Sequence, residues 1–310
     1  MRIAISGSTG LIGTALARSL RADGHDIVRL VRRGTRPDRR TGGTGTAGAA
    51  EVLWDPKRQY VDADGLAGCD AVVHLAGAGV ASRRWTDAYK KELRDSRVLG
   101  TAAVAEALAS LDEPPRTFVA GTAIGYYGDT GDRAVDESAP PGHGFLAGLC
   151  REWEEATAAA EEAGIRTVHA RTGLVVAPRG GAWGPLFPLF KAGLGGRLGS
   201  GRQWWSWISL EDEVRALRQL LTDTRLYGPV NLTGPQPVTN REATAVMGRV
   251  LHRPTLFPVP APVLRAVLGE FAGDVLGSQR VLPERLLESG FRFAQPQLAD
   301  AVRAALRPGV

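Results

Sequence analysis

Three glycines near the start of the chain, Gly7, Gly10 and Gly13, have a spacing suited to binding phosphate groups. A short apolar strand precedes them at residues 2–6, and a helical pattern follows at residues 11–22. In such a loop the first glycine allows the turn, the second lets backbone approach a pyrophosphate, and the third lets the helix pack closely. A turn that merely needs glycines is the alternative. The flanking elements, with a second strand at residues 26–31, favour a dinucleotide site formed by Gly7, Ser8, Thr9, Gly10, Leu11, Ile12 and Gly13.

The end of the second strand indicates which dinucleotide is bound. Arg32 and Arg33 stand where proteins that prefer NAD place Asp or Glu against the ribose hydroxyls. A guanidinium binds a ribose 2′-phosphate through charged hydrogen bonds, whereas a carboxylate repels it. The sequence therefore favours NADP(H), with Arg32 as the first candidate and Arg33 as the second. A solvated arginine pair at a strand end is the alternative.

The elements that position these residues alternate between strand and helix, as in a doubly wound parallel sheet. Apolar runs predict buried strands at residues 71–75, 117–121 and 167–170, and long helical patterns lie at 87–111 and 145–163. Residues 34–50 are rich in Gly, Thr and Arg without periodicity, so they are interpreted as an inserted loop. The expected fold class is α/β, with a Rossmann-type sheet.

The pattern changes in the second half of the chain. Residues 178–201 are rich in Gly, Pro and large apolar side chains, and the tail from residue 254 is punctuated by prolines. Helices are predicted at residues 211–223 and 240–251, with a strand at 229–232. We expect residues 1–175, with segments from about 208–235, to form the nucleotide-binding domain. Residues 176–207 and 236–310 are expected to form a smaller C-terminal lobe, with the substrate in the cleft between them.

The composition excludes several classes of protein. With 44% hydrophobic and 23% charged residues, the chain reads as an ordinary globular protein, and no apolar run approaches the roughly 18 residues of a membrane span. The start of the chain shows no cleavable signal, so a cytoplasmic protein is expected. Two cysteines give no disulfide framework, and the net charge of +5 is not gathered into a long run that indicates nucleic acid. The five histidines stand apart, so no metal site is predicted.

Further motifs narrow the interpretation. They are His74-Leu75-Ala76-Gly77, Arg84-Trp85-Thr86, Ser96-Arg97, Gly125-Tyr126-Tyr127-Gly128, Gly199-Ser200-Gly201, Trp207-Ile208 and Asn231-Leu232-Thr233-Gly234-Pro235. Together with the glycine loop and Arg32, they make the chain resemble the extended short-chain dehydrogenase/reductase superfamily. Within it the chain is similar to the atypical "epimerase family protein" group, which is NAD-dependent epimerase/dehydratase-like and has a C-terminal domain of unknown function. The resemblance covers nearly the whole chain.

The resemblance implies further cofactor contacts. Leu75 and Ala76 would line the adenine-ribose side with Gly77 making room, and Val175 would cover the nicotinamide end. Glu92 and Arg97 lie on a helix that flanks the cofactor in the family, so both would reach its riboses or phosphates. For Glu92, an ordinary surface charge that pairs with Lys91 or Arg94 is an equal alternative.

The usual catalytic relay of that superfamily is missing. Classical members use Tyr-x-x-x-Lys, in which the tyrosine transfers a proton and the lysine lowers its pKa. Phe145 and Leu149 stand at these positions here. The remaining candidates are Thr122, near the superfamily's Ser/Thr position, and the adjacent Tyr126 and Tyr127. An unassisted phenol, with a pKa of about 10, is a better acid than base at neutral pH. Two aromatic rings that merely pack the loop are the alternative.

Two functions remain open from the sequence. The chain is either an NADP(H)-dependent oxidoreductase acting on a small carbonyl or sugar-like substrate, or a non-catalytic NADP(H)-binding regulator. Trp204, Trp205 and Trp207 either wall an apolar substrate pocket or seal the two lobes. The expected partner is a small-molecule substrate, with neither nucleic acid nor membrane, and a homodimer is left open.

Overall fold

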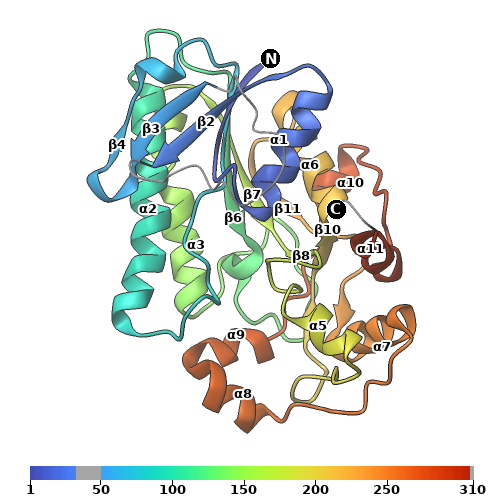
Figure 1. Ribbon diagram of the computed structural model, residues 1–310. Coiled ribbons are helices and arrows are strands. Elements are labelled where there is room, and N and C mark those ends of the chain that lie inside the picture. Colours follow the sequence, from blue (N-terminus) through green and yellow to red (C-terminus); the bar gives the residue numbers. More distant parts are fainter. Residues whose placement is uncertain (33–49, 308–310) are drawn as a thin grey trace.

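An eight-stranded sheet forms the centre of the computed structural model, which describes residues 1–32 and 50–307 (Figure 1). Its strands are β1 (Arg2–Ser6), β2 (Asp26–Arg32), β3 (Glu51–Asp55), β4 (Tyr60–Val61), β5 (Ala71–His74), β6 (Thr117–Ala123), β7 (Arg166–Thr172) and β11 (Gly228–Leu232). They lie in the order β11-β7-β6-β5-β1-β2-β3-β4, and all neighbours are parallel except β3 and β4. The predicted α/β class with a Rossmann-type sheet is confirmed.

Helices cover both faces of this sheet, each through its apolar side. On one face, α1 (Leu11–Ala22) and α6 (Leu210–Thr222) bury residues such as Leu16, Leu20 and Leu217 against the strands. The other face carries α2 (Asp87–Ala109), α3 (Phe145–Glu155) and α4 (Ala158–Glu162) (Figure 1). Because β1 lies between β2 and β5, its carboxyl end is at the point where the strand order reverses. Open α/β sheets bind their ligands at this point.

A smaller lobe has a core of its own, built around Trp183, Phe187, Trp207, Met247 and Val302. Its strands are β8 (Leu174–Val176), β9 (Trp204–Trp205), β10 (Trp207–Ser209) and β12 (Val238–Thr239). Its helices are α5 (Leu186–Lys191), α7 (Asn240–Leu251), α8 (Ala261–Leu268), α9 (Ala272–Leu276) and α11 (Leu298–Ala305). α10 (Glu284–Glu288), which was expected in this lobe, packs instead on β11 and buries Leu286 in the core of the sheet domain. β8 pairs with β10 in parallel and β9 with β12 in antiparallel orientation.

Residues 278–282 join this lobe to the sheet domain. The amide of Thr130 donates to the carbonyl of Ser278 at 2.8 Å, and that of Leu282 donates to the carbonyl of Val135, also at 2.8 Å. On their other side, the Ser206 hydroxyl accepts from the amide of Val281 at 2.8 Å. A segment near the end of the chain therefore lies between two segments that come from its middle.

The structure corrects the predicted helix over residues 145–163. The chain forms two helices there, α3 and α4, because the Thr157 hydroxyl donates to the carbonyl of Glu154 at 2.7 Å and the helix breaks. The short strands β3 and β4 were not predicted. The predicted loop at residues 34–50 lies outside the described residues, apart from Ala50.

No helix in residues 1–32 or 50–307 is long and apolar enough to cross a membrane. The same residues contain no group of three or more His, Cys, Asp or Glu side chains that could hold a metal ion. Cys69 and Cys150 are both buried free thiols, and burial raises the pKa of Cys150 to about 12.

Candidate cofactor and substrate site

The glycine loop between β1 and α1 leaves no room for side chains. Gly7 has a φ of +66°, and a Cβ on it would lie 2.8 Å from the carbonyl carbon of Leu75. A Cβ on Gly13 would lie 2.3 Å from the carbonyl oxygen of Gly7, so only glycine lets α1 pack on the loop. Gly10 is the N-cap of α1 and supplies no side-chain hydrogen bond. The first amides of α1 are therefore left for an anion.

Ser6 and His74 join the carboxyl ends of β1 and β5 beneath this loop. The Ser6 hydroxyl oxygen accepts from the amides of Leu75 at 3.1 Å and Ala76 at 3.3 Å, and it lies 2.7 Å from His74 Nδ1. Because the oxygen already accepts two hydrogen bonds, its proton is directed to Nδ1, which places the imidazole proton on Nε2. Burial lowers the pKa of His74 to about 4, so the ring is neutral at pH 7. Sequence analysis did not single out either residue as a site residue.

Arginines lie on β2, close to the glycine loop. Arg29 donates through Nε to the Ser8 hydroxyl at 3.3 Å, and its Nη1 lies 3.6 Å from a carboxylate oxygen of Glu51. Arg32 is exposed at the last position of β2, where a carboxylate would indicate NAD. Arg33 lies outside the described residues. Sequence analysis missed Arg29, because a strand residue three positions before Arg32 gives no sign of reaching the loop.

The segment after β5 contains Gly77, which adjoins Arg97 of α2. A Cβ on Gly77 would lie 3.4 Å from Cζ of Arg97. The buried guanidinium of Arg97 donates to the carbonyl of Ala78 at 2.9 Å and lies 4.9 Å from the ring centroid of Trp153. Burial lowers the pKa of Arg97, and no carboxylate pairs with it among the described residues. A buried cation without a carboxylate is costly unless an anionic ligand approaches it.

Glu92 and Val175 lie in different surroundings. Glu92 is exposed on α2, and its carboxylate lies 3.8 Å from the guanidinium of Arg83. This surface ion pair agrees with the alternative interpretation of Glu92, although the partner is not a neighbour on the helix. Val175 is buried in β8, and a Cβ added to Gly181 would lie 3.5 Å from the carbonyl oxygen of Val175 and 3.6 Å from Cδ2 of Leu11. The structure thus brings Val175 and the first residue of α1 to the same place.

The positions of the missing relay belong to an aromatic cluster. The ring centroid of Phe145 lies 5.0 Å from that of Trp85, edge to face, and Leu149 is buried in the same cluster. The first turn of α3 therefore presents apolar side chains where a tyrosine and a lysine would stand. Neither side chain can move a proton or supply a positive charge.

The candidate polar residues gather instead around a buried ion pair. Arg171 on β7 makes two hydrogen bonds to the carboxylate of Glu154 on α3, both of 2.7 Å. The Thr122 hydroxyl donates to the same carboxylate at 3.2 Å. The Tyr127 hydroxyl accepts from Arg171 and donates to the side-chain oxygen of Asn231, both at 2.8 Å. The hydroxyls of Thr122 and Tyr127 are thus already engaged within the protein.

Tyr126 differs from its neighbour. Its ring lies over the guanidinium of Arg171, 3.5 Å from Cζ to the ring centroid, and its hydroxyl makes no hydrogen bond to the described residues. Burial raises the pKa of Tyr127 to about 12, and the positive charge of Arg171 and its hydrogen bond oppose the shift only in part. Burial alone would lower the pKa of Arg171, but the hydrogen bonds and charge of Glu154 outweigh it and raise that pKa. At neutral pH Tyr127 is therefore neutral, and of the two tyrosines Tyr126 is the one whose hydroxyl is not engaged by the described residues.

The three tryptophans at residues 204–207 pack against other parts of the protein rather than lining a pocket. Trp207 is buried and donates to the carbonyl of Gln236 at 2.9 Å, and the ring centroid of Trp205 lies 5.6 Å from that of Trp183. Trp204 is half-buried under the guanidinium of Arg280, 4.3 Å from the ring centroid. Trp204 and Trp205 are both partly buried, and Trp207 is the fully buried member of the three.

Glu213 is a buried carboxyl in the first turn of α6. One of its oxygens accepts from the Thr172 hydroxyl at 2.8 Å, and the other has no partner. Burial raises the pKa of Glu213 from 4.5 to about 8, and the hydrogen bond from Thr172 opposes the shift only in part. Glu213 is therefore mostly protonated at neutral pH.

Glu213→Gln is expected to flatten the pH dependence of stability. Between pH 4.5 and about 8 the folded state keeps a proton on Glu213 that the unfolded chain has released. Stability therefore falls with rising pH in that window, by up to about 1.4 kcal/mol per pH unit. Urea unfolding at several pH values should show a smaller decline for the variant than for the native protein. Glu211→Gln, at an exposed position of the same turn, is the control, and an equally steep decline in Glu213→Gln would contradict the assignment.

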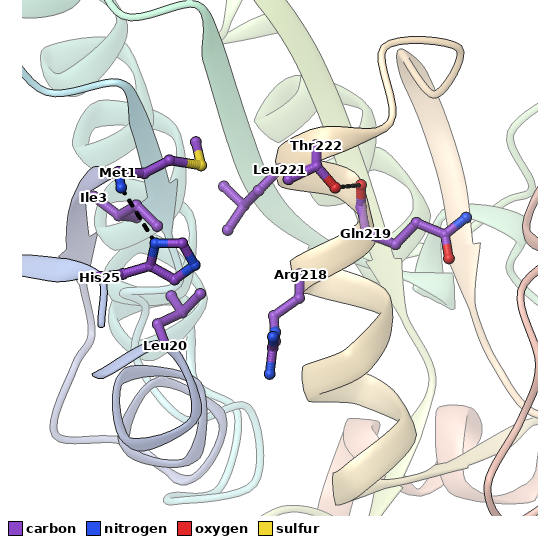
Figure 2. A pocket seen from close by; sticks show the side chains of 8 residues that line it. All are labelled: Met1, Ile3, Leu20, His25, Arg218, Gln219, Leu221 and Thr222. Atoms are coloured by element: carbon purple, nitrogen blue, oxygen red, sulfur yellow. Dashed lines mark hydrogen bonds between the residues drawn. The ribbon is translucent and has the colours of Figure 1, made fainter. Parts of the chain in front are cut away.

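A pocket of about 320 Å³ lies at the other end of the sheet (Figure 2). It is lined by Met1, Ile3, Leu20, His25, Arg218, Gln219, Leu221 and Thr222. Because β1 runs from Arg2 to Ser6 and into the glycine loop, a pocket beside Met1 is at the end of the strand remote from that loop. None of the predicted site residues lines it. The pocket is therefore separate from the candidate cofactor site.

The parallel sheet, its switch point and the glycine loop define a Rossmann-type α/β protein of the dinucleotide-binding kind. The profile of the NAD dependent epimerase/dehydratase family matches residues 3–233, and that of a domain of unknown function matches residues 259–305. The chain belongs to the NAD dependent epimerase/dehydratase family, as its motifs had indicated.

Relatives match along nearly the whole chain. Epimerase family protein Mb2239 of Mycobacterium bovis is 47% identical over 309 residues, which is 99% of this chain and 98% of the relative. Human epimerase family protein SDR39U1 is 33% identical, over 98% of this chain and 99% of the relative.

Solved structures match in the same way. The structure of human SDR39U1 (isoform 2) with NADPH has a TM-score of 0.85 and 32% identity, over 98% of this chain and 99% of that chain. A nucleoside-diphosphate sugar epimerase from Corynebacterium glutamicum has a TM-score of 0.79 and 32% identity, over 99% of this chain but 58% of that longer chain.

Proposed function

We propose that this chain binds NADP(H) at the glycine loop and acts as an oxidoreductase on a small carbonyl or sugar-like substrate. The observation that carries the proposal is the loop itself, where Gly7 and Gly13 leave no room for side chains and α1 begins with uncapped amides. A solved relative contains NADPH, and it superposes on nearly the whole chain.

The preference for the phosphorylated cofactor rests on three arginines. Arg32 ends β2 where a carboxylate would favour NAD, and Arg29 adjoins Ser8 of the loop. Arg97 is buried beside Gly77 without a carboxylate partner among the described residues, so an anionic group of the cofactor would compensate its charge. The cofactor would therefore lie from the end of β2, across the loop, to the segment after β5.

Titration of the purified protein with NADPH and NADH, followed by the fluorescence of the reduced nicotinamide, tests this preference. NADPH is expected to bind at least about tenfold more tightly than NADH, because a charged hydrogen bond contributes roughly 1.5–3 kcal/mol. Arg32→Gln should reduce the difference between the two affinities, because it weakens the binding of NADPH and leaves the binding of NADH unchanged. Equal affinities for the two cofactors would contradict the assignment to NADP(H).

The chain's own residues limit how a reaction proceeds. The reduced nicotinamide, when bound, supplies a hydride, and reduction of a carbonyl also needs one proton at its oxygen. Tyr126 is the candidate donor, because its hydroxyl is not engaged and its ring lies on the guanidinium of Arg171. A cation over the ring stabilises the phenolate left after proton transfer, although Glu154 offsets part of that charge. The relay position holds no lysine to activate this tyrosine, so it is a better proton donor than base. It therefore suits the reduction of an activated carbonyl better than an epimerisation, which also needs a base.

Tyr126→Phe is expected to impair catalysis, whereas Tyr127→Phe is expected mainly to lower the stability of the fold. With a panel of aldehydes, diketones and quinones as substrates, Tyr126→Phe should lower kcat by about 100-fold and leave NADPH affinity unchanged. Tyr127→Phe should cost about 1–3 kcal/mol of stability, because Arg171 and Asn231 lose a buried partner, with a smaller effect on kcat. Full turnover by Tyr126→Phe would remove this residue from the mechanism.

A non-catalytic NADP(H) sensor is the second candidate. It is favoured by Phe145 and Leu149, which fill the relay positions with apolar atoms, and by the mutual neutralisation of Arg171 and Glu154. Tight NADPH binding without oxidation of any member of the carbonyl panel, together with a cofactor-dependent change in association with a partner, would support this function over the first.

A further inference from the structure

The smaller lobe exposes a group of large apolar side chains. The exposed fractions are 75% for Leu256, 55% for Phe257, 56% for Leu194 and 66% for Val267, and Leu189 and Val263 are about half exposed. Single exposed apolar residues are common on protein surfaces, whereas a contiguous group marks a binding surface.

The segments that carry these residues adjoin one another. Arg253 donates through Nε to the carbonyl of Lys191 at 2.9 Å, so the segment after α7 lies against the end of α5. Gly196 packs directly on the carbonyl of Phe257, and Leu198 pairs with Val259 in an isolated bridge. α8 follows at once, and the chain between α7 and α8 runs along the lower end of the molecule in Figure 1. We call residues 188–198 and 249–268 the apolar edge.

The charges of this region have a single sign. Across residues 186–210 and 243–269 there is no Asp or Glu, while the basic residues are Lys191, Arg197, Arg202, Arg249, Arg253 and Arg265. None of them forms an ion pair with a carboxylate in residues 1–32 or 50–307. These two segments carry a charge of +6, compared with a net charge of +5 for the whole chain. A charge asymmetry of this kind favours an anionic partner.

We infer that the apolar edge attaches the protein to an anionic lipid surface, with Leu256 and Phe257 inserted among the headgroups and the arginines on their phosphates. Exposed apolar tips beside basic residues without acidic ones are the pattern of interfacial membrane binding. Such attachment needs no spanning helix, and the described residues contain none. It departs from the expectation, drawn from the sequence, that the protein has no membrane partner. It is independent of the proposed cofactor chemistry.

Other occupants fit the apolar edge less well. A second copy of the chain placed symmetrically on it would bring arginines against arginines, which costs free energy. An acidic protein would suit the charges, but the apolar side chains protrude from a segment interrupted by Pro254, Pro258 and Pro260 rather than lining a groove. Protruding apolar tips suit a deformable lipid interface.

Sedimentation of the full chain with vesicles tests the inference. We expect binding to vesicles that contain phosphatidylglycerol, weaker binding as salt rises, and little binding to pure phosphatidylcholine. Leu256→Ser with Phe257→Ser, and separately Arg249→Glu with Arg265→Glu, should each weaken binding by about tenfold or more. Thermal melting checks that each variant folds.

Matched substitutions elsewhere on the surface are the controls. Tyr227→Ser with Leu287→Ser removes apolar side chains exposed by 64% and 44%, and Arg116→Glu with Arg133→Glu reverses exposed charges. Both should bind vesicles as the native protein does. Equal binding to both lipids, no binding to either, or unchanged binding by the two edge variants would overturn the inference. So would a concentration-dependent dimer that the Leu256 and Phe257 changes abolish, because it would assign the apolar edge to self-association.

Discussion

Gly13→Ala is expected to lose NADPH binding and to melt well below the native protein. The added Cβ would lie 2.3 Å from the carbonyl oxygen of Gly7, which is backbone and cannot swing aside. Relief requires α1 to move off the loop, which costs about 1–3 kcal/mol and displaces the amides proposed to bind the cofactor's phosphates. Thermal melting and NADPH titration of the same preparation measure the two effects.

Two other glycines are matched controls for this prediction. A Cβ on Gly10 would lie 3.3 Å from the same carbonyl oxygen, so Gly10→Ala should melt nearly as the native protein does while hindering the approach of a pyrophosphate. Gly148 lies within α3 with nothing near its added Cβ, so Gly148→Ala should be neutral or stabilise the helix by up to about 1 kcal/mol. A Gly13→Ala protein as stable as Gly10→Ala would show that the loop is looser than described.

Removal of Glu154 is expected to destabilise the protein by about 3–5 kcal/mol. Glu154→Gln would leave the Arg171 guanidinium, whose side chain is 3% exposed, buried without its counter-charge. It would also deprive the Thr122 hydroxyl of its carboxylate acceptor. Urea unfolding of the variant should show the loss as a lower midpoint, with a slope that changes little.

A neighbouring carboxylate on the same helix provides the control. Glu152 pairs with Arg94 on the surface, with side chains 34% and 48% exposed, so Glu152→Gln should cost less than about 1 kcal/mol. The double variant Glu154→Leu with Arg171→Met should recover much of the stability, since it removes both buried charges. Equal losses of stability in Glu154→Gln and Glu152→Gln would contradict this prediction. They would mean that another group or water compensates the charge of Arg171 when Glu154 is replaced.

Local patterns predicted the bounds of several helices and strands well. α1 and α7 begin and end where the sequence indicated, because Gly10 and Thr239 mark their starts and apolar residues recur along one side. Thr239 and Glu242 form a capping box, which fixes the start of α7 to a residue. The strands around the glycine loop followed from short apolar runs, and their order agrees with the family resemblance.

The remainder depends on contacts between distant residues. β3 and β4 are too short, at five and two residues, to stand out, and β3 is held by its register with β2, as in Arg32 opposite Trp54. The pairing of Arg171 with Glu154 joins a strand to a helix across the sheet face, and no spacing in the sequence encodes it. Arg29 lay close enough to Arg32 to be considered, but only the structure shows that it contacts Ser8.

The segment at residues 278–282 limits how the two regions of this protein can be recombined in evolution. It hydrogen-bonds on one side to Thr130 and Val135, and on the other to Ser206. The region recognised by the second family profile therefore supplies backbone partners to the region recognised by the first. Shortening the gene before this segment would strip both neighbours of their partners, so the two regions cannot be exchanged between genes as independent modules.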